Sequence, residues 1–266
     1  MSATNVAAPI DVEAATRTLF EAQRDRREIE PFTDTSTFDE KTAYAIQKKL
    51  VTKQVEQEAT RIVGLKLGLT SEAKQKQMSV HEPIYGILLD SRYVGEGEPL
   101  AVSTLIHPKV EPEIAVFTSA PLRGPGVTPD QARKAIAFAT PAMEVIDSRY
   151  KDFRFTLTDV IADNTSAARF AIASRRVPAA NVDLRTVGVV FEKNGEVVST
   201  AAGAAILGDP ANAVAWLANK LAEHGESIAA GTTIMAGALT DAIAIAPGDV
   251  ITVTVAQLGS LTLRCV

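Results

Sequence analysis

The sequence predicts an α+β fold in which a helical N-terminal region precedes a larger β-rich body. Two observations carry this prediction. Apolar residues recur at helical spacing through most of the first 60 residues, and from residue 61 onward most segments alternate between apolar and polar side chains. We divide the chain into a mainly helical region, residues 1–75, and a β-rich body, residues 76–266, which holds the candidate metal site described below.

Two helices are expected in the N-terminal region. Residues 11–30 place apolar side chains at helical spacing with charged residues between them. Residues 37–57 show the same pattern, and Thr37 stands three residues before Glu40, which is typical of a capping box at a helix start. The two patterns therefore predict a pair of amphipathic helices joined by a short loop.

The β-rich body is expected to contain strands with two more helices between them. Alternation predicts strands at 62–69 and 110–117, and an apolar segment predicts another at 141–148. Helices should start at Thr128 and Asp209, because a proline follows each at the first helical position. Further strands, separated by turn residues, are expected after residue 231.

Composition excludes several classes of protein. Of the 266 residues, 46% are hydrophobic, which is ordinary for a globular chain, and a net charge of −5 with mixed signs argues against a nucleic-acid or membrane-surface protein. The single cysteine, Cys265, excludes an internal disulfide, and we expect it to be buried. No signal peptide and no apolar run long enough for a membrane span are evident, so a cytoplasmic location is expected.

Three glutamates suggest a metal site. Glu111 and Glu113 share one face of a predicted strand and lie about 6.6 Å apart along it. On this pair alone, a solvated strand face is the simpler interpretation, and a cation such as Mg²⁺ is the alternative. Glu144 changes the balance, because it lies inside an apolar segment where a carboxylate needs a partner. Three carboxylates with water completing the shell would suit Mg²⁺, with Mn²⁺ as the alternative ion.

Other polar residues leave more than one interpretation open. Lys66 stands between two glycines on one strand face, where a ligand could approach the backbone, although an exposed surface lysine has the same pattern. The segment 163–166 offers polar side chains that either bind a ligand or satisfy a turn. Asp147 and Arg149 follow Glu144 closely, and the simplest interpretation is that they pair with each other.

Several long motifs in the expected order resemble those of one enzyme family. They read "GLKLGLTSEAKQKQM", "PIYGILLD", "IHPKVEPEIAV", "APLRGPG", "MEVIDSRY", "VIADNTSAARF" and "LRTVGVVFEKNGEVV". The chain from about residue 35 to its end resembles the 4-oxalocrotonate (2-oxo-3-hexenedioate) decarboxylases of catechol meta-cleavage pathways. These are relatives of the 2-hydroxypenta-2,4-dienoate hydratases in the fumarylacetoacetate-hydrolase-like superfamily.

The resemblance implies a helical N-terminal part on a mixed β-roll and assigns roles to individual residues. A Mg²⁺ site made by an E-x-E motif and a later glutamate falls on Glu111, Glu113 and Glu144. Lys66 and Ser166 take the catalytic positions. The positions around the substrate are Lys66, Leu67, Ile84, Asp163, Asn164 and Ser166.

One short motif favours the decarboxylases over the hydratases. The related hydratases typically read "HQPDFG" where this chain has "HEPIYG", so that Ile84 replaces an aspartate that can help move a proton or water. An aliphatic side chain cannot do acid–base work and keeps the pocket dry. A dry pocket suits the loss of CO₂ and disfavours the addition of water.

The expected reaction is the metal-dependent loss of CO₂ from (3E)-2-oxohex-3-enedioate to give 2-hydroxypenta-2,4-dienoate. The rivals are a 2-hydroxypenta-2,4-dienoate hydratase, a C–C hydrolase of the same superfamily, for which no His/Glu base arrangement is apparent, and a non-catalytic metal-binding subunit that supports a hydratase. The resemblance also implies a homo-oligomer and a complex with the hydratase.

Overall fold

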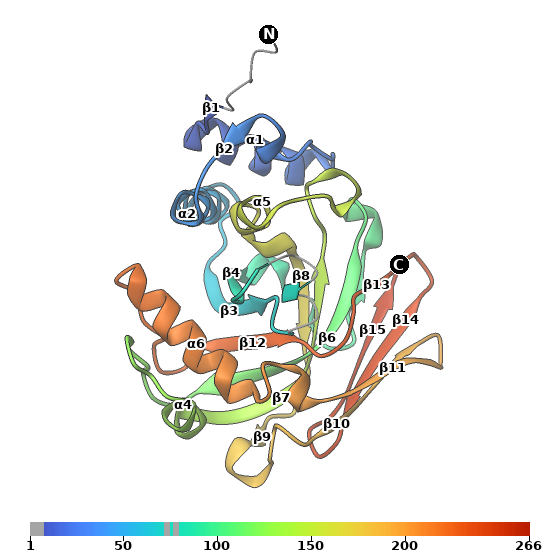
Figure 1. The fold of residues 1–266 in the computed structure, drawn as a ribbon. Helices are drawn as coiled ribbons and strands as arrows, with labels where there is room; N and C mark the ends of the chain where they lie inside the picture. The colour runs from blue at the N-terminus through green and yellow to red at the C-terminus, as the bar shows by residue number, and fades with distance from the viewer. Residues whose placement is uncertain (1–7, 72–74, 77–79) are drawn as a thin grey trace.

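The computed structural model describes residues 8–71, 75–76 and 80–266 of the chain (Figure 1). Parts of the "GLKLGLTSEAKQKQM" motif, residues 72–74 and 77–78, lie outside the described residues. Within the described part, no helix combines the length and the hydropathy that crossing a membrane requires.

The two predicted N-terminal helices are present and lie together at one end of the molecule, where the second of them packs against α5 (Figure 1). The α-helices are α1 (Val12–Asp25), α2 (Glu40–Gln57), α4 (Pro129–Ala135), α5 (Leu157–Ala162) and α6 (Pro210–Glu223). Both helix starts predicted in the β-rich body are confirmed, because Thr128 and Gln131 form a capping box and Asp209 caps α6. Helix α6 lies along β12, where it also contacts α4.

The strands form a large mixed sheet, a five-stranded sheet and a small parallel pair. The large sheet has the order β4-β3-β12-β6-β7-β8, with β13 added to β6 and β9 added to β7, and the smaller sheet has the order β11-β10-β14-β15-β5. The strands of the large sheet are β3 (Ile62–Gly68), β4 (Ile84–Leu89), β6 (Lys109–Thr118), β7 (Ile136–Ile146), β8 (Ala167–Ile172), β9 (Val177–Pro178), β12 (Thr233–Ala238) and β13 (Ile243–Ala244). The others are β1 (Ala8–Pro9), β2 (Ser36–Thr37), β5 (Pro99–Leu100), β10 (Gly188–Lys193), β11 (Glu196–Ala202), β14 (Val250–Val255) and β15 (Gly259–Cys265).

The large sheet curls until its two ends meet, which confirms the predicted roll. Strands β4 and β8 stand at opposite ends of the strand order, yet they contact each other. The side-chain amide of Asn164 spans this junction: its Oδ1 accepts from the main-chain N–H of Ile87 at 2.8 Å, and its Nδ2 donates to the Ile87 carbonyl at 2.9 Å. The curled sheet therefore has an inner face and an outer face.

The outer face of β6 carries the apolar residues and the inner face carries the glutamates. Val110, Ile114 and Val116 are fully buried in the main hydrophobic core, which also takes in residues of the N-terminal helices, α6 and the five-stranded sheet. Cys265 is buried and free, as expected. Because side chains alternate along a strand, this packing turns Glu111 and Glu113 to the inner face.

Local details differ from the sequence-based expectations. Asp39, not Thr37, caps α2, and its side chain accepts from the N–H of Thr42 at 2.8 Å. The first helix ends at Asp25, where Arg26 adopts a left-handed conformation, rather than running to residue 30. The division at residue 75 stays a prediction about domains, although β3, which precedes it, already belongs to the large sheet.

Candidate active site

Three glutamates converge on the inner face of the curled sheet. Strands β6 and β7 pair so that Glu111 lies directly opposite Glu144, and Glu113 follows two residues along β6. One carboxylate oxygen from each of the three lies within 4.8 Å of the others. This cluster, called the glutamate triad below, matches the ligand set that the sequence predicted.

The glutamate triad is buried, which makes its negative charge costly. Glu113 is 0% exposed, Glu144 1% and Glu111 9%. Burial raises the pKa of Glu113 well above its ordinary range, and the neighbouring carboxylate of Glu144 raises it further. Burial also raises the pKa of Glu144, while the ammonium of Lys66 opposes this shift.

Lys66 enters the site from β3 and meets the triad directly. Its Nζ lies 2.9 Å from Oε2 of Glu144 and 3.4 Å from the carbonyl oxygen of Thr165, and the residue is only 2% exposed. The interpretation of Lys66 as an exposed surface lysine is therefore wrong. One ammonium cannot neutralise three carboxylates, so a divalent cation would complete the charge balance.

The free oxygens of the triad fit a metal ion. Neither Oε1 of Glu113 nor Oε1 of Glu144 forms a hydrogen bond with any described residue. Oε2 of Glu113 is held by the main-chain N–H of Gly237 at 2.9 Å, which fixes the direction of the carboxylate. Buried carboxylate oxygens without donors are the hard ligands that Mg²⁺ prefers, so the donor set fits this ion.

Glycines make room around Lys66. A Cβ on Gly86, which pairs with Lys66 across β3 and β4, would lie 2.4 Å from Oγ1 of Thr165 and 3.0 Å from Cδ of Lys66. A Cβ on Gly68 would lie 3.1 Å from Cγ1 of Ile84 and 3.7 Å from Nζ of Lys66. Ile84, which is 3% exposed and joins the main hydrophobic core, therefore lies next to Gly68 on the same side as the ammonium.

The segment between α5 and β8 reaches the site through an unusual turn. Asn164, Thr165 and Ser166 all have positive φ, at 48°, 54° and 59°. Such a run of left-handed residues without glycine is strained, and strain of this kind clusters at functional sites. The turn sends the Thr165 carbonyl to Lys66 and buries the hydroxyls of Thr165 and Ser166, neither of which hydrogen-bonds within the described residues.

The other predicted site residues are held in different ways. Both carboxylate oxygens of Asp163 are taken by Arg149, through its side chain and its main-chain N–H. Asn164 uses its whole amide on Ile87. The side chain of Leu67 lies in the main hydrophobic core, on the opposite face of β3 from Lys66. Their contacts with a substrate stay predictions.

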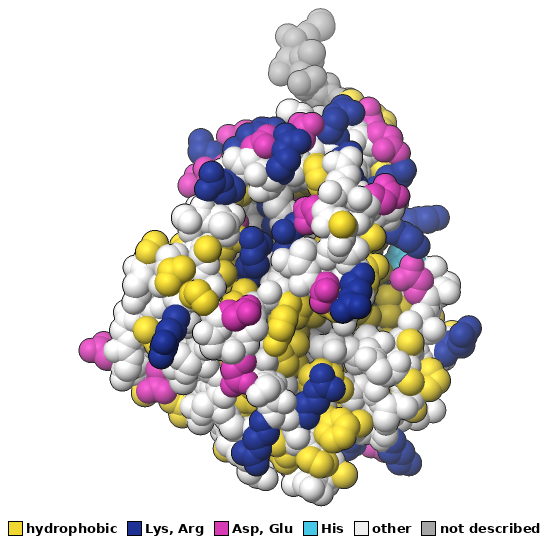
Figure 2. Space-filling view, turned by 180° about the vertical axis from the view of Figure 1, so that it is seen from behind, with side chains coloured by type: hydrophobic (Ala, Val, Ile, Leu, Met, Phe, Trp, Pro, Cys, Tyr) yellow, Lys and Arg dark blue, Asp and Glu magenta, His cyan; other side chains and the backbone are white. Residues whose placement is uncertain are grey.

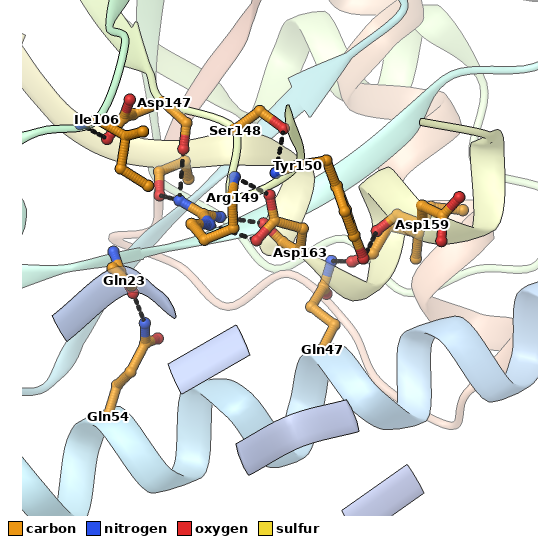
Figure 3. Close-up of polar contacts among 12 residues, drawn as sticks. Gln23, Gln47, Gln54, Ile106, Asp147, Ser148, Arg149, Tyr150, Asp159 and Asp163 are labelled. Carbon is orange, nitrogen blue, oxygen red and sulfur yellow. Dashed lines mark hydrogen bonds and ion pairs between the residues drawn. The ribbon is translucent and has the colours of Figure 1, made fainter. Parts of the chain in front are cut away.

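Arg149 forms its ion pair with Asp163, the residue that precedes the Asn164–Ser166 turn (Figure 3). The prediction that its partner is the side chain of Asp147 is therefore wrong. The guanidinium contacts the Asp163 carboxylate and also donates to main-chain carbonyls, including that of Asp147 at 2.9 Å. The Asp147 carboxylate instead accepts from the N–H groups of Ile106 and His107, each at 2.8 Å. The carboxylate that pairs with Arg149 is thus that of Asp163, which is 14 residues away in sequence.

Sequence reasoning missed Thr165, Gly86 and Gly237. A glycine inside the apolar segment "PIYGILLD" is a sign of close approach to the backbone, and this signal could have found Gly86. The φ of Gly237 is 115°, and a Cβ there would lie 2.1 Å from Oγ1 of Thr70. Thr165 acts through its main-chain carbonyl, which no side-chain pattern reports.

Comparisons with known proteins agree with this geometry. Residues 56–266 match the model of the fumarylacetoacetate (FAA) hydrolase C-terminal family. A 4-oxalocrotonate decarboxylase of Pseudomonas putida is 53% identical over 224 residues, covering 84% of each chain. A 2-keto-4-pentenoate hydratase of Paraburkholderia xenovorans is 36% identical over 254 residues, covering 95% of this chain and 94% of that one.

A solved structure extends the likeness to the whole fold. The structure of 4-oxalocrotonate decarboxylase from Pseudomonas putida G7, complexed with magnesium and adipate, superposes with a TM-score of 0.93 at 46% identity. The match covers 97% of this chain and 100% of that one. The chain therefore belongs to the fumarylacetoacetate hydrolase family and, within it, to the 4-oxalocrotonate decarboxylases.

Proposed function

We propose that this chain catalyses the metal-dependent decarboxylation of (3E)-2-oxohex-3-enedioate to 2-hydroxypenta-2,4-dienoate and CO₂, as a step of catechol meta-cleavage. The observation that carries the proposal is the buried glutamate triad with Lys66 against it. The higher identity to a decarboxylase than to a hydratase supports the choice of reaction.

The glutamate triad would hold Mg²⁺, with Mn²⁺ as the alternative ion. When bound, the ion would supply Lewis-acid stabilisation of negative charge at the oxygen-rich end of the substrate. Magnesium and a dicarboxylate occur together in the structure of the Pseudomonas putida relative, which supports this pairing of ion and substrate class.

The chemistry requires a place for negative charge and a source for one proton. The bond between C5 and the C6 carboxylate breaks, its electron pair moves through the conjugated double bond to the 2-oxo oxygen, and CO₂ leaves. That oxygen then takes up one proton to give the dienol product. The ammonium of Lys66 would stabilise the oxygen and donate the proton, because it is buried against Glu144 and the Thr165 carbonyl.

Ile84 would decide between decarboxylation and hydration. Its side chain lies next to Gly68 on the same side as Lys66, and it is nearly completely buried. An aliphatic wall there offers no group that can activate water. The intermediate dienol would then be released rather than hydrated.

The turn formed by Asn164–Ser166 would shape the substrate pocket. The hydroxyl of Ser166, which has no hydrogen-bond partner in the described part of the chain, would bind a substrate carboxylate, and Asp163 and Asn164 would hold the turn in position. Leu67 would contribute through its main chain, because its side chain belongs to the core. Assembly into a homo-oligomer, a complex with the hydratase that consumes the product, and a cytoplasmic location remain part of the proposal.

The test incubates purified protein with (3E)-2-oxohex-3-enedioate, with Mg²⁺ or with EDTA, and follows CO₂ release. We expect Mg²⁺-dependent CO₂ release and accumulation of 2-hydroxypenta-2,4-dienoate. A parallel reaction supplies 2-hydroxypenta-2,4-dienoate as the starting material. If the protein consumes that compound and releases no CO₂ from the dicarboxylate, it is a hydratase and the proposal fails.

A further inference from the structure

A cavity of about 450 Å³ lies between the ends of the N-terminal helices and β8, away from the glutamate triad. Four arginines line it: Arg24, Arg26, Arg92 and Arg169. The proposed reaction uses none of them. In a chain with a net charge of −5, such a gathering of cations around one cavity calls for a physical reason.

Arg169 gives the strongest reason to regard this cavity as a binding site. It is half-buried on β8, where it donates to the Ala168 carbonyl at 2.8 Å and to Oγ1 of Thr104 at 3.3 Å. It forms no ion pair with a carboxylate in the described part of the chain. Burial and the nearby Arg92 lower the pKa of Arg169, whereas the charges of Asp147 and Glu58 raise it. A half-buried cation whose nearest carboxylates are engaged elsewhere is costly.

A second guanidinium reaches the same short turn. Arg26, in its left-handed conformation at the end of α1, donates to the carbonyl of Ser103, the residue next to Thr104. Like Arg169, it forms no ion pair with a carboxylate among the residues that the structure describes. Both guanidinium groups therefore meet at the 3-10 turn η3 (Val102–Thr104).

The carboxylates near the cavity are already engaged. Glu58 forms a close two-oxygen pair with Arg92, at 2.6 and 2.7 Å. The carboxylate of Asp147 accepts from two main-chain N–H groups, one of which, that of Ile106, is visible in Figure 3. Arg24 is paired with its neighbour Asp25. Among the described residues, the exposed Arg26 and the half-buried Arg169 are therefore the arginines of this cavity that form no ion pair with a carboxylate.

We propose that this cavity is a second ligand site, at which Arg169 and Arg26 bind a small oxyanion that carries carboxylate or phosphate groups. The planar guanidinium presents paired N–H donors that match the two oxygens of either group. The site is separate from the glutamate triad, because the residues that line the cavity include neither a member of the triad nor Lys66.

The test is isothermal titration of the Mg²⁺-loaded protein with inorganic phosphate and, separately, with succinate, at constant ionic strength. We expect saturable binding by the wild type and at least a tenfold loss of affinity in Arg169→Gln. Arg264→Gln is the matched control, since it removes one exposed arginine on β15 outside the cavity and should bind like the wild type. Tighter binding of phosphate assigns the site to phosphorylated ligands, and tighter binding of succinate assigns it to carboxylates.

Two further variants keep the outcome decisive. If Arg169→Gln does not fold by circular dichroism, Arg26→Gln carries the test and should also bind the anions more weakly. Glu113→Gln, which weakens the metal site, reports any binding at the glutamate triad. The proposal is overturned if the wild type shows no saturable binding, if the cavity variants bind like the wild type, or if Glu113→Gln alone abolishes binding.

Discussion

Lys66 is the residue whose surroundings say most about its role. Its ammonium is buried beside Glu144 and the Thr165 carbonyl, and the absence of a side chain at Gly86 lets Thr165 and Lys66 pack closely against β4. Two hypotheses follow. Lys66 either stabilises and protonates the reacting oxygen, or it only offsets the charge of the glutamate triad.

The Lys66→Met variant separates these hypotheses. Loss of a positioned proton donor should lower kcat about 100-fold or more. Mg²⁺ binding, measured by titration calorimetry, should remain, since the three carboxylates stay in place. Lost metal binding in this variant, with activity restored by excess Mg²⁺, would instead support the counter-charge hypothesis.

Ile84 is the second residue that can be tested alone. Replacing Ile84 with Asp should lower the rate of CO₂ release about tenfold, equivalent to about 1.4 kcal/mol in the barrier, and should introduce measurable hydration of 2-hydroxypenta-2,4-dienoate. The reason is that a carboxylate admits and activates water where the aliphatic side chain excludes it. Ile84→Asn, matched in size and uncharged, should lose decarboxylation without gaining hydration. Equal hydration by both variants would remove Ile84 from this role.

Among the secondary-structure elements, the junction of β4 and β8 holds the Asn164–Ser166 turn next to Lys66. Asn164 joins the two ends of the curled sheet through two hydrogen bonds with Ile87, and the same residue begins the left-handed turn that brings Thr165 to Lys66. One side chain thus closes the sheet and orders the active-site wall. A substrate role for Asn164 would have to use contacts other than these.

Asn164→Ala is expected to destabilise the fold by about 1–3 kcal/mol, because it leaves the N–H and the carbonyl of Ile87 without their partners. Urea unfolding measures this loss. Asn194→Ala, which removes an exposed amide on the turn between β10 and β11, serves as a comparison and should cost less. An Asn164→Ala protein as stable as the wild type would show that the junction is held by other contacts.

At the scale of the whole molecule, the buried pair of Arg149 and Asp163 links the Asn164–Ser166 turn to the body of the protein (Figure 3). Burial raises the pKa of Asp163 to about 6, although Arg149 opposes the shift. The folded state therefore binds a proton at higher pH than the unfolded state, whose carboxyl keeps its ordinary value of 3.8. This group adds stability as the pH falls through 6 and loses that contribution as the pH rises again.

Comparison of the wild type with Asp163→Asn checks whether Asp163 adds stability as the pH falls. Between pH 7.5 and pH 5, the free energy of unfolding of the wild type should gain about 1 kcal/mol relative to the variant, which cannot take up the proton. Urea unfolding at both pH values measures the difference, and titrations common to the two proteins cancel. A wild type that loses stability relative to Asp163→Asn at pH 5 would mean that Arg149 holds the pKa of Asp163 below its ordinary value.

The sequence predicted those features that depend on neighbouring residues. Alternation around Glu111 and Glu113 placed both on one strand face, and the proline after Asp209 marked a helix start. The cap of α2 was misassigned because Asp39 and Thr37 both suit the position and only one can receive the N–H of the first turn.

Contacts between residues that are far apart in the sequence could not be predicted from such local patterns. Arg149 selects Asp163 rather than the nearby side chain of Asp147, and Asn164 pairs with a main chain 77 residues away. These choices follow from how the sheet curls, which no local pattern specifies. The meeting of Glu144 with the E-x-E pair is equally non-local and was predicted through the family resemblance together with its apolar surroundings.

The most direct test of the account measures Mg²⁺ binding and CO₂ release together in the wild type and in Glu113→Gln. Glu196→Gln, which changes an exposed glutamate at the start of β11, is the control. We predict that Glu113→Gln loses most of its Mg²⁺ affinity and its CO₂ release in parallel, while Glu196→Gln behaves like the wild type. A Glu113→Gln protein that releases CO₂ at the wild-type rate without bound metal would contradict it.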